Sequence, residues 1–187
     1  MVAGSEVTVV APDRRGLLWQ AAGVLAAHRL AVRSANAASH GSMAVTSFSV
    51  AHPFGEPPDA TLVTSDLRRA LAGELDVAER LDRQGLRGTR AQSAHRPWLA
   101  PPKVTLVDDA SGAATVVEVR AHDAPGLLWR IGRALGECGL NVRAARVETL
   151  GAEAVDVFYV VGTDGRQVTD PATRGLISAR VLSALTG

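Results

Sequence analysis

The chain has 187 residues, of which 47% are hydrophobic, and its 20 Lys and Arg nearly balance its 19 Asp and Glu. This balance argues against a broad basic surface, so we expect no nucleic-acid partner. The single cysteine, Cys138, excludes an internal disulfide and is typical of a reducing compartment. No charged leader opens the chain and no apolar run approaches about 18 residues. We therefore expect a soluble, cytoplasmic protein without membrane contact.

The sequence contains an internal repeat. Residues 7–19 read VTVVAPDRRGLLW and residues 117–129 read VEVRAHDAPGLLW, at an offset of 110 residues. Aligning residues 7–50 with residues 117–160 without a gap gives 18 identities in 44 positions. A repeat of this size predicts a duplicated domain, and each half is long enough for one modest core.

In the first half, alternating apolar residues predict a strand over residues 7–11, closed by Pro12. Leu17, Leu18, Ala21, Ala22 and Leu25 form one stripe at helical spacing, which predicts a helix ending near Arg29. The other elements expected in this half are strands at residues 30–39 and 44–51, a helix starting at Asp59 or Thr61, and a helical turn or two at residues 75–81.

Residues 84–102 lose periodicity and collect Gly, Arg, Ser and Pro, which is typical of a linker. We place the domains at residues 1–85 and 103–187, with the linker at 86–102. The second half repeats the order of the first, with strands at 103–107 and 115–121, a helix from Pro125, strands at 140–149 and 155–161, and a last helix starting at Asp170 and Pro171. The strand at 103–107 either pairs antiparallel with 115–121 or belongs to the first domain.

Each half therefore reads β-α-β-β-α, and a fourth strand would complete it to βαββαβ. This order predicts an α+β fold of two ferredoxin-like domains, with antiparallel sheets and helices on one face. The uncovered face and the open sheet edges are left to pair with a second copy of the domain, which gives a reason for two domains in one chain. A homodimer through sheet edges is also a candidate assembly.

The motif DxxGLL at residues 13–18 and 123–128, with LAVRSANAASHG at 30–41 and GLNVRAARVETLG at 139–151, resembles the ACT domain, a small regulatory module that binds amino acids. The hairpin VTLVDDAS and the ending EAVDVFYVVGTDGRQVTDP more narrowly resemble the tandem ACT region at the C-terminus of the bifunctional uridylyltransferase/uridylyl-removing enzymes, which modify the PII nitrogen signal protein. The Ala- and Arg-rich composition is similar to the actinobacterial members. The resemblance implies a regulatory module whose partners are the catalytic domains of such an enzyme.

A DxxG corner between a strand and a helix presents backbone N–H groups that attract a carboxylate, and a glycine lets a ligand approach the main chain. The resemblance implies that a free amino acid, with glutamine favoured, lies between this corner of one domain and the second strand of the other. Aspartate would take the ammonium group and Asn36 a side-chain amide. The candidate ligand-binding residues are Asp13, Gly16, Leu17 and Leu18 facing Arg143 to Arg146, and Asp123, Gly126, Leu127 and Leu128 facing Ser34 to Asn36.

Each of these residues also has a purely structural interpretation. The two aspartates can be helix N-caps, the two glycines can serve only the turn, and the four leucines fit a core that offers only its amides to a ligand. Trp19 and Trp129 fit packing at the domain border better than stacking platforms. The pair Asn36 and Arg146 predicts two unequal sites, although two surface residues that diverged explain it equally well.

The sequence carries no catalytic signature. It lacks a nucleophile elbow, HExxH, a P-loop, and the nucleotidyltransferase and HD metal motifs of the enzymes it resembles. We expect no metal, no cofactor and no catalysis by these residues. The main alternative to an amino-acid sensor is a structural dimerisation or partner-docking module without ligand. A small-molecule enzyme domain of ferredoxin-like shape is a third alternative.

Overall fold

The two halves of the chain repeat one order of elements. The computed structural model describes residues 5–52, 59–86, 100–107 and 111–186, so most of the predicted linker lies outside the described residues. The first half contains β1 (Ser5–Pro12), α1 (Leu17–Ala27), β2 (Ala31–His40), β3 (Met43–Ala51), α2 (Ala60–Ala72) and the short α3 (Val77–Arg83). The second half contains β4 (Lys103–Val107), β5 (Thr115–His122), α5 (Leu127–Glu137), β6 (Asn141–Leu150), β7 (Glu153–Val161) and α6 (Pro171–Thr186).

The seven strands of the described residues form one antiparallel sheet in the order β1-β3-β2-β6-β7-β5-β4. The prediction of an α+β fold with antiparallel strands is confirmed, but the halves share a single sheet because β2 pairs directly with β6. Without this pairing, both strands would expose unpaired N–H and C=O groups. One edge strand of each half therefore pairs with the other copy of the repeat within the chain, and the buried residues of both halves form one cluster.

The pairing of β2 with β6 relates the two halves by an approximate twofold axis. Asn36 lies directly opposite Arg146, its own equivalent at the repeat offset of 110. The pairs on either side exchange under the same offset, which is the self-complementary arrangement of a symmetric dimer. These pairs are Ser34–Glu148 and Ala38–Ala144.

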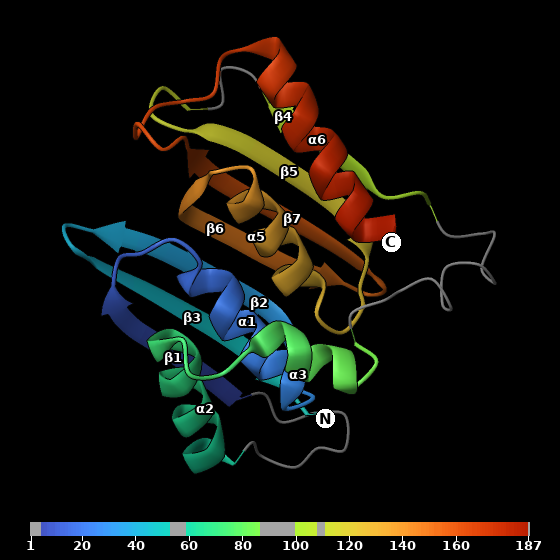
Figure 1. Ribbon diagram of the computed structural model, residues 1–187. Helices are drawn as coiled ribbons and strands as arrows, with labels where there is room; N and C mark the ends of the chain where they lie inside the picture. The colour runs from blue at the N-terminus through green and yellow to red at the C-terminus, as the bar shows by residue number, and fades with distance from the viewer. Residues whose placement is uncertain (1–4, 53–58, 87–99, 108–110, 187) are drawn as a thin grey trace.

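The helices lie on one face of the sheet, as expected, with α1 beside α5 at the centre (Figure 1). The two helices approach closely at glycines. A Cβ on Gly132 would stand 2.5 Å from the Cβ of Trp19, and a Cβ on Gly23 would stand 2.5 Å from Cδ1 of Trp129 and 2.4 Å from Val77. Each tryptophan thus packs on the helix of the other half, so the interpretation of both as packing residues at the border between the halves is confirmed.

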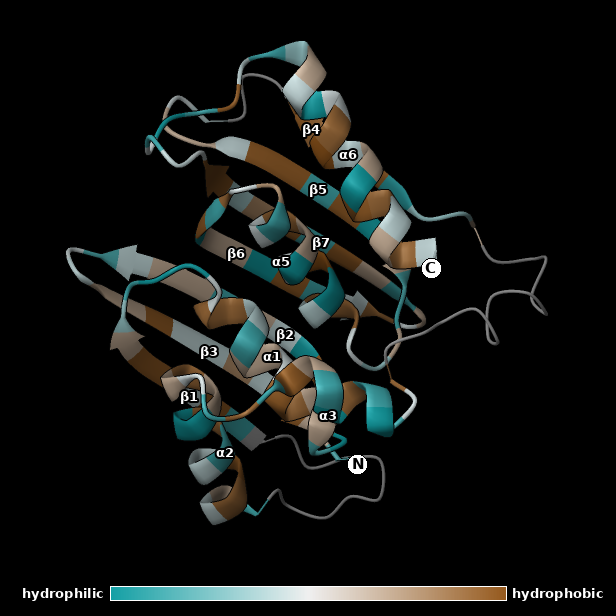
Figure 2. Cartoon of the chain, in the orientation of Figure 1, coloured by the Kyte–Doolittle hydropathy of each residue, from teal (hydrophilic) through white to brown (hydrophobic). Residues whose placement is uncertain are grey.

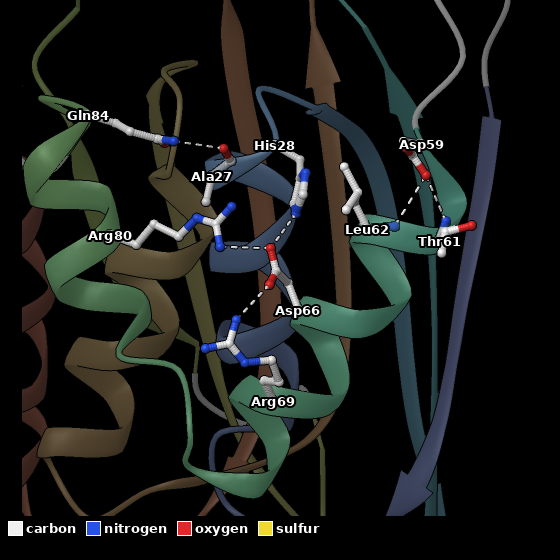
Figure 3. Close-up of polar contacts among 9 residues, drawn as sticks. All are labelled: Ala27, His28, Asp59, Thr61, Leu62, Asp66, Arg69, Arg80 and Gln84. Carbon is white, nitrogen blue, oxygen red and sulfur yellow. Dashed lines mark hydrogen bonds and ion pairs between the residues drawn. The ribbon is translucent and has the colours of Figure 1, made fainter.

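A polar cluster fixes α3 against α1 and α2 (Figure 3). Asp66 of α2 is largely buried, and its carboxylate lies 2.9 Å from Nε2 of His28 and 2.7 Å from Nη1 of Arg80. Gln84 donates a hydrogen bond of 3.0 Å to the backbone oxygen of Ala27. These contacts place the end of α3 beside the end of α1, where it can reach the border with the second half.

The strand at residues 103–107 pairs antiparallel with β5, which is the first of its two predicted alternatives. Its outer edge lies beside α6, where Arg174 donates a hydrogen bond of 3.1 Å to the Leu106 oxygen. Strand β5 shows hydrophobic stretches interrupted by polar residues (Figure 2), and Val117 and Val119 are fully buried beneath the helices. Among the described residues, no helix has the length and apolarity needed to cross a membrane.

The helix starts correct one interpretation of the DxxG corners. Helix α1 begins after Gly16 and α5 after Gly126, and no side chain among the described residues makes a capping hydrogen bond at either start. Asp13 and Asp123 are therefore not N-caps, and the helix predicted from Pro125 begins two residues later. Asp59, in contrast, does cap α2, because it accepts hydrogen bonds from the amides at the start of that helix.

Candidate functional site

The two DxxG corners have the same backbone. The amide of Asp13 donates to Ser42 at 2.8 Å, and the amide of Asp123 donates to Ala152, the equivalent position, at 2.9 Å. Gly16 and Gly126 precede their helices with φ of 94° and 74°, a left-handed conformation that favours glycine. Since the first turn of a helix leaves its amides without intrahelical acceptors, each corner offers N–H groups to an anion.

The corner at Asp123 opens into a cavity of about 520 Å³ between the two halves. This volume lies within the range of about 300 to 1,000 Å³ that is common for small-molecule sites. The second half contributes the corner itself, Val147 and Asp156, and the first half contributes residues 29–33 and the end of α3. The walls are mainly apolar, and the titratable groups that line them are Arg29, Arg33, His52, Asp123 and Asp156.

The corner at Asp13 leaves a space of only about 20 Å³. The indole of Trp19 occupies it, since a Cβ on Gly16 would stand 3.1 Å from that ring. Trp129 instead packs against α1 and α3, and the only atom of the described residues within 4 Å of a Cβ on Gly126 is the Leu86 backbone oxygen, at 3.4 Å. The tryptophans are equivalent in the repeat, so their different packing is one cause of the difference between the two corners.

An arginine from the other half reaches each corner. The register of the sheet shifts at Arg33 in β2 and at Arg143 in β6, and such a bulge redirects the side chain of the extra residue. Arg143 donates a hydrogen bond of 3.0 Å to Asp13, whereas Arg33 lies 4.0 Å from Asp123. The carboxylate of Asp13 is 11% exposed and that of Asp123 is 30% exposed. The Asp123 carboxylate at the second corner is therefore more exposed and less closely paired with an arginine than the Asp13 carboxylate.

Asp156 is a cavity residue that the sequence reasoning missed. It lies in β7 in phase with Phe158 and Val160, so its side chain faces the helices and is 1% exposed. Its Oδ1 has no hydrogen-bond partner among the described residues. The signal was available, because a charged residue at a helix-facing position interrupts an apolar alternation. The equivalent position in the first half is Thr46, which lines the small space at the first corner.

Burial shifts the acidity of both carboxyl groups in the cavity. Burial, and then the nearby Asp123 carboxylate, raise the pKa of Asp156 to about 7, against a backbone hydrogen bond from Glu148. Burial also raises the pKa of Asp123, with Arg33 and His122 acting in the opposite direction. Two neighbouring carboxyl groups with raised pKa values form an anionic end to the cavity as they ionise, and a cation would stabilise them there.

The predicted site residues divide into two groups. One group lies at the corners, and the side chains of its leucines are at most 6% exposed, so they offer a ligand mainly their amides. These residues are Asp13, Gly16, Leu17, Leu18 and Arg143 at the first corner and Asp123, Gly126, Leu127 and Leu128 at the second.

The other group, Ser34, Asn36 and Arg146, does not line either corner. Beyond the bulge at Arg33, the helix-facing residues of β2 are in phase with the buried Ala35, which leaves Ser34 and Asn36 on the uncovered face. Arg146 lies on the same face and pairs with Glu148 at 2.8 Å. The corner at Asp123 therefore faces residues 31–33 instead of the predicted residues 34–36.

The described residues contain no group of three or more His, Cys, Asp or Glu side chains that could hold a metal ion. Within the part of the chain that the structure describes, Asp123 and Asp156 are the carboxyl groups that line the cavity. The chemistry available at this site is the recognition of a small ligand by the backbone amides of the corner and by the carboxyl groups of Asp123 and Asp156.

Residues 115–177 match the ACT domain family. The chain is 46% identical over 169 residues to the bifunctional uridylyltransferase/uridylyl-removing enzyme of Streptomyces coelicolor, a match that covers 87% of this chain. The enzymes of the same name from Mycobacterium tuberculosis and Gluconobacter oxydans are 38% and 34% identical over 83% and 97% of this chain. Each match covers 20% of the relative, so the chain spans about a fifth of their length. The chain thus contains an ACT domain at residues 115–177 and is related over most of its length to one segment of the bifunctional uridylyltransferase/uridylyl-removing enzymes.

Proposed function

We propose that the chain is a cytoplasmic regulatory module of two ACT domains that binds a free amino acid, with glutamine favoured. In this proposal it controls an enzyme that transfers nucleotidyl groups to the PII signal protein and removes them. The names of the relatives support the controlled activity, and the ACT match supports regulation by an amino acid. The residues present act as the sensor, and catalysis belongs to domains outside this segment.

The observation that carries the proposal is the cavity of about 520 Å³ at the second corner. Its helix N-terminus offers amides to a carboxylate, and Asp123 and Asp156 offer carboxyl groups to an ammonium. A free amino acid carries both of these charged groups on one carbon atom. The apolar walls, which include Leu30 and Val147, suit the aliphatic part of a side chain.

The position of the cavity suggests how binding would act on an attached enzyme. Residues of both halves line it, and Gln84 and Leu86 bring the end of α3 to the same cavity. A ligand that contacts both halves favours the relative orientation in which all of these contacts form. That difference in affinity between orientations is the free energy that a neighbouring catalytic domain can use.

Isothermal titration of the full chain with glutamine and the other amino acids tests this function. We expect heat of binding from one or a few of them, and an increase in melting temperature with the same ligands. No heat and no thermal shift with any amino acid at millimolar concentration would contradict the proposal.

A specific observation favours the alternative of a docking module. Val10, Met43 and Val45 are 60%, 41% and 44% exposed on neighbouring strands of the uncovered sheet face. Exposed apolar side chains grouped in this way are common where another protein binds. Light scattering with and without amino acids distinguishes the two functions, because a dimer that is insensitive to every amino acid would favour docking.

A further inference from the structure

Asp156 has an environment that the fold itself does not explain. Its side chain is 1% exposed and lines the large cavity, and its Oδ1 has no partner among the described residues. A buried carboxyl oxygen without a partner destabilises the folded chain. The first half forms the same strand with Thr46 at this position, so the strand does not require an acid.

The surroundings indicate what kind of group would satisfy this oxygen. The charge that acts on Asp156 is a second carboxylate, Asp123, on the other side of the corner. The cationic Arg33 lies beside Asp123, at 4.0 Å. A positively charged hydrogen-bond donor in the cavity would therefore meet an unpartnered acceptor and relieve the repulsion between two carboxylates.

The start of α5, which lines the same cavity, offers backbone amides to an anion. Leu128 and Trp129 precede the first intrahelical hydrogen bond of α5, which runs from Arg130 to Gly126 at 3.0 Å. Their amides belong to the turn whose N–H groups a helix leaves for another acceptor. A ligand with an anion at this end and a cation at Asp156 would fit both features.

We propose that Asp156 accepts the ammonium group of the bound amino acid, and that the aspartate at this position confines binding to the second corner. This inference rests on the proposed function, since it assigns the recognition residue of that same site. The first corner has Thr46 at the equivalent position, an ion pair between Arg143 and Asp13, and the Trp19 ring in the remaining space. The first corner therefore has neither a carboxyl group at the position equivalent to Asp156 nor the volume for a ligand.

The test uses the full chain, glutamine, and glutaramate, which is glutamine without its α-amino group. Wild type is expected to bind glutamine and not glutaramate in isothermal titration. Asp156→Asn and Asp156→Thr are expected to weaken glutamine binding by about 10- to 100-fold, the loss of one charge-assisted hydrogen bond. Thr46→Val, at the equivalent buried position of the first half, is the matched control and should leave the affinity unchanged.

A pH series adds a readout that a merely structural role would not move. The ammonium requires an ionised Asp156, so wild-type affinity should decrease from pH 8 to pH 6, and Asp156→Asn should lose this dependence. The other titratable groups of the described residues that line the same cavity as Asp156 are Arg29 and His52 after α1 and β3, Arg33 on β2, and Asp123 after β5. All four remain in the variant, so the difference between the two profiles reports Asp156.

The outcomes separate this inference from the proposed function. If wild type and Asp156→Asn bind glutamine equally, or if wild type binds glutaramate as well as glutamine, the assignment of Asp156 is wrong and amino-acid sensing stands. If glutamine gives no signal, each other amino acid is tested with its own deaminated acid in the same way. Binding of none of them would overturn both proposals. Thermal melts of each variant confirm that a lost signal is not a loss of folding.

Discussion

The two DxxG corners of this chain share the same backbone geometry but differ in the side chains around them and in the volume they leave open. Both place an aspartate and a left-handed glycine before a helix, and both receive an arginine from a bulge in the other half. One leaves a cavity of about 520 Å³ and the other about 20 Å³. The two halves thus keep the same backbone geometry at the corner, while a few side chains determine whether the corner has room for a ligand.

The differences that matter lie outside the repeated motif. The Trp19 ring lies against Gly16, but Trp129 packs against Gly23 and away from Gly126. Helix α3 belongs to the first half, yet its end lines the cavity of the second corner. A twofold arrangement can therefore give one site when a single additional element lies on one side of the axis.

The largest expected effect on the free energy of unfolding comes from exchanging Asp156 of β7 and its equivalent, Thr46 of β3. The pKa of Asp156 is raised to about 7 in the folded chain, so between about pH 4 and 7 the unfolded chain releases a proton that the folded chain keeps. Stability contributed by this group therefore falls as pH rises through that window. We expect Asp156→Thr to raise the free energy of unfolding on the order of 4 kcal/mol at pH 8 and hardly at all at pH 4.

Chemical denaturation at pH 4, 6 and 8 measures this difference. The reciprocal change, Thr46→Asp, brings a carboxyl group into the small space at the first corner and should destabilise the chain increasingly with pH. A constant difference between Asp156→Thr and wild type across the range would show that ionisation of Asp156 is not coupled to folding.

The contact between α1 and α5 holds the two corners in one unit and gives the second prediction. A Cβ at Gly132 would stand 2.5 Å from Trp19, so Gly132→Ala should destabilise the chain by about 2 to 3 kcal/mol, a typical effect of overpacking. Gly175→Ala in α6 is the control, because nothing lies within 4 Å of its Cβ and alanine favours a helix by up to about 1 kcal/mol. Thermal or urea unfolding compares the two. Equal effects of both changes would contradict the close approach of the helices.

Much of this fold could be predicted from local patterns. The repeat, the strands and the glycine corners follow from alternation, apolar stripes and the DxxG motif. The pairing of β2 with β6 could not be predicted, because the sequence of an edge strand does not name its partner. Ser34 and Asn36 lie on the uncovered face for a physical reason, since the bulge at Arg33 changes which residues of β2 face the helices.

The cavity and the side chains that line it were harder to predict than the backbone geometry of the corner. The alternation of β7 predicts that Asp156 faces the helices, but its importance depends on the cavity beside it. That volume is set by the direction in which Trp129 packs and by the end of α3, which is contributed by the other half. Such contacts between distant segments have no periodic signature.

The cluster at Asp66 provides the third way to test the comparison, because it exists on one side of the twofold axis. Asp66→Asn would weaken the contacts to His28 and Arg80 within a largely buried cluster, with an expected loss of about 1 to 2 kcal/mol. Since Gln84 and Leu86 carry α3 to the cavity, we also expect weaker glutamine binding by titration. Glu79→Gln on the same short helix, whose exposed side chain pairs with Arg83, serves as control. Unchanged binding despite lower stability would show that α3 is not needed at the cavity.

The smallest expected effect concerns the two bulge arginines. Arg143 and Asp13 form a partly exposed pair at 3.0 Å, so Arg143→Ala should cost about 0.5 to 1 kcal/mol, and less at high salt. Arg33 lies 4.0 Å from Asp123 and is more than half exposed, so Arg33→Ala should change stability even less. Urea unfolding at low and high salt measures both. Because Asp123 would lose the cation beside it, Arg33→Ala should nonetheless alter binding at the second corner more than Arg143→Ala does. The reverse order would mean that the first corner, despite its small volume, is the one that meets the ligand.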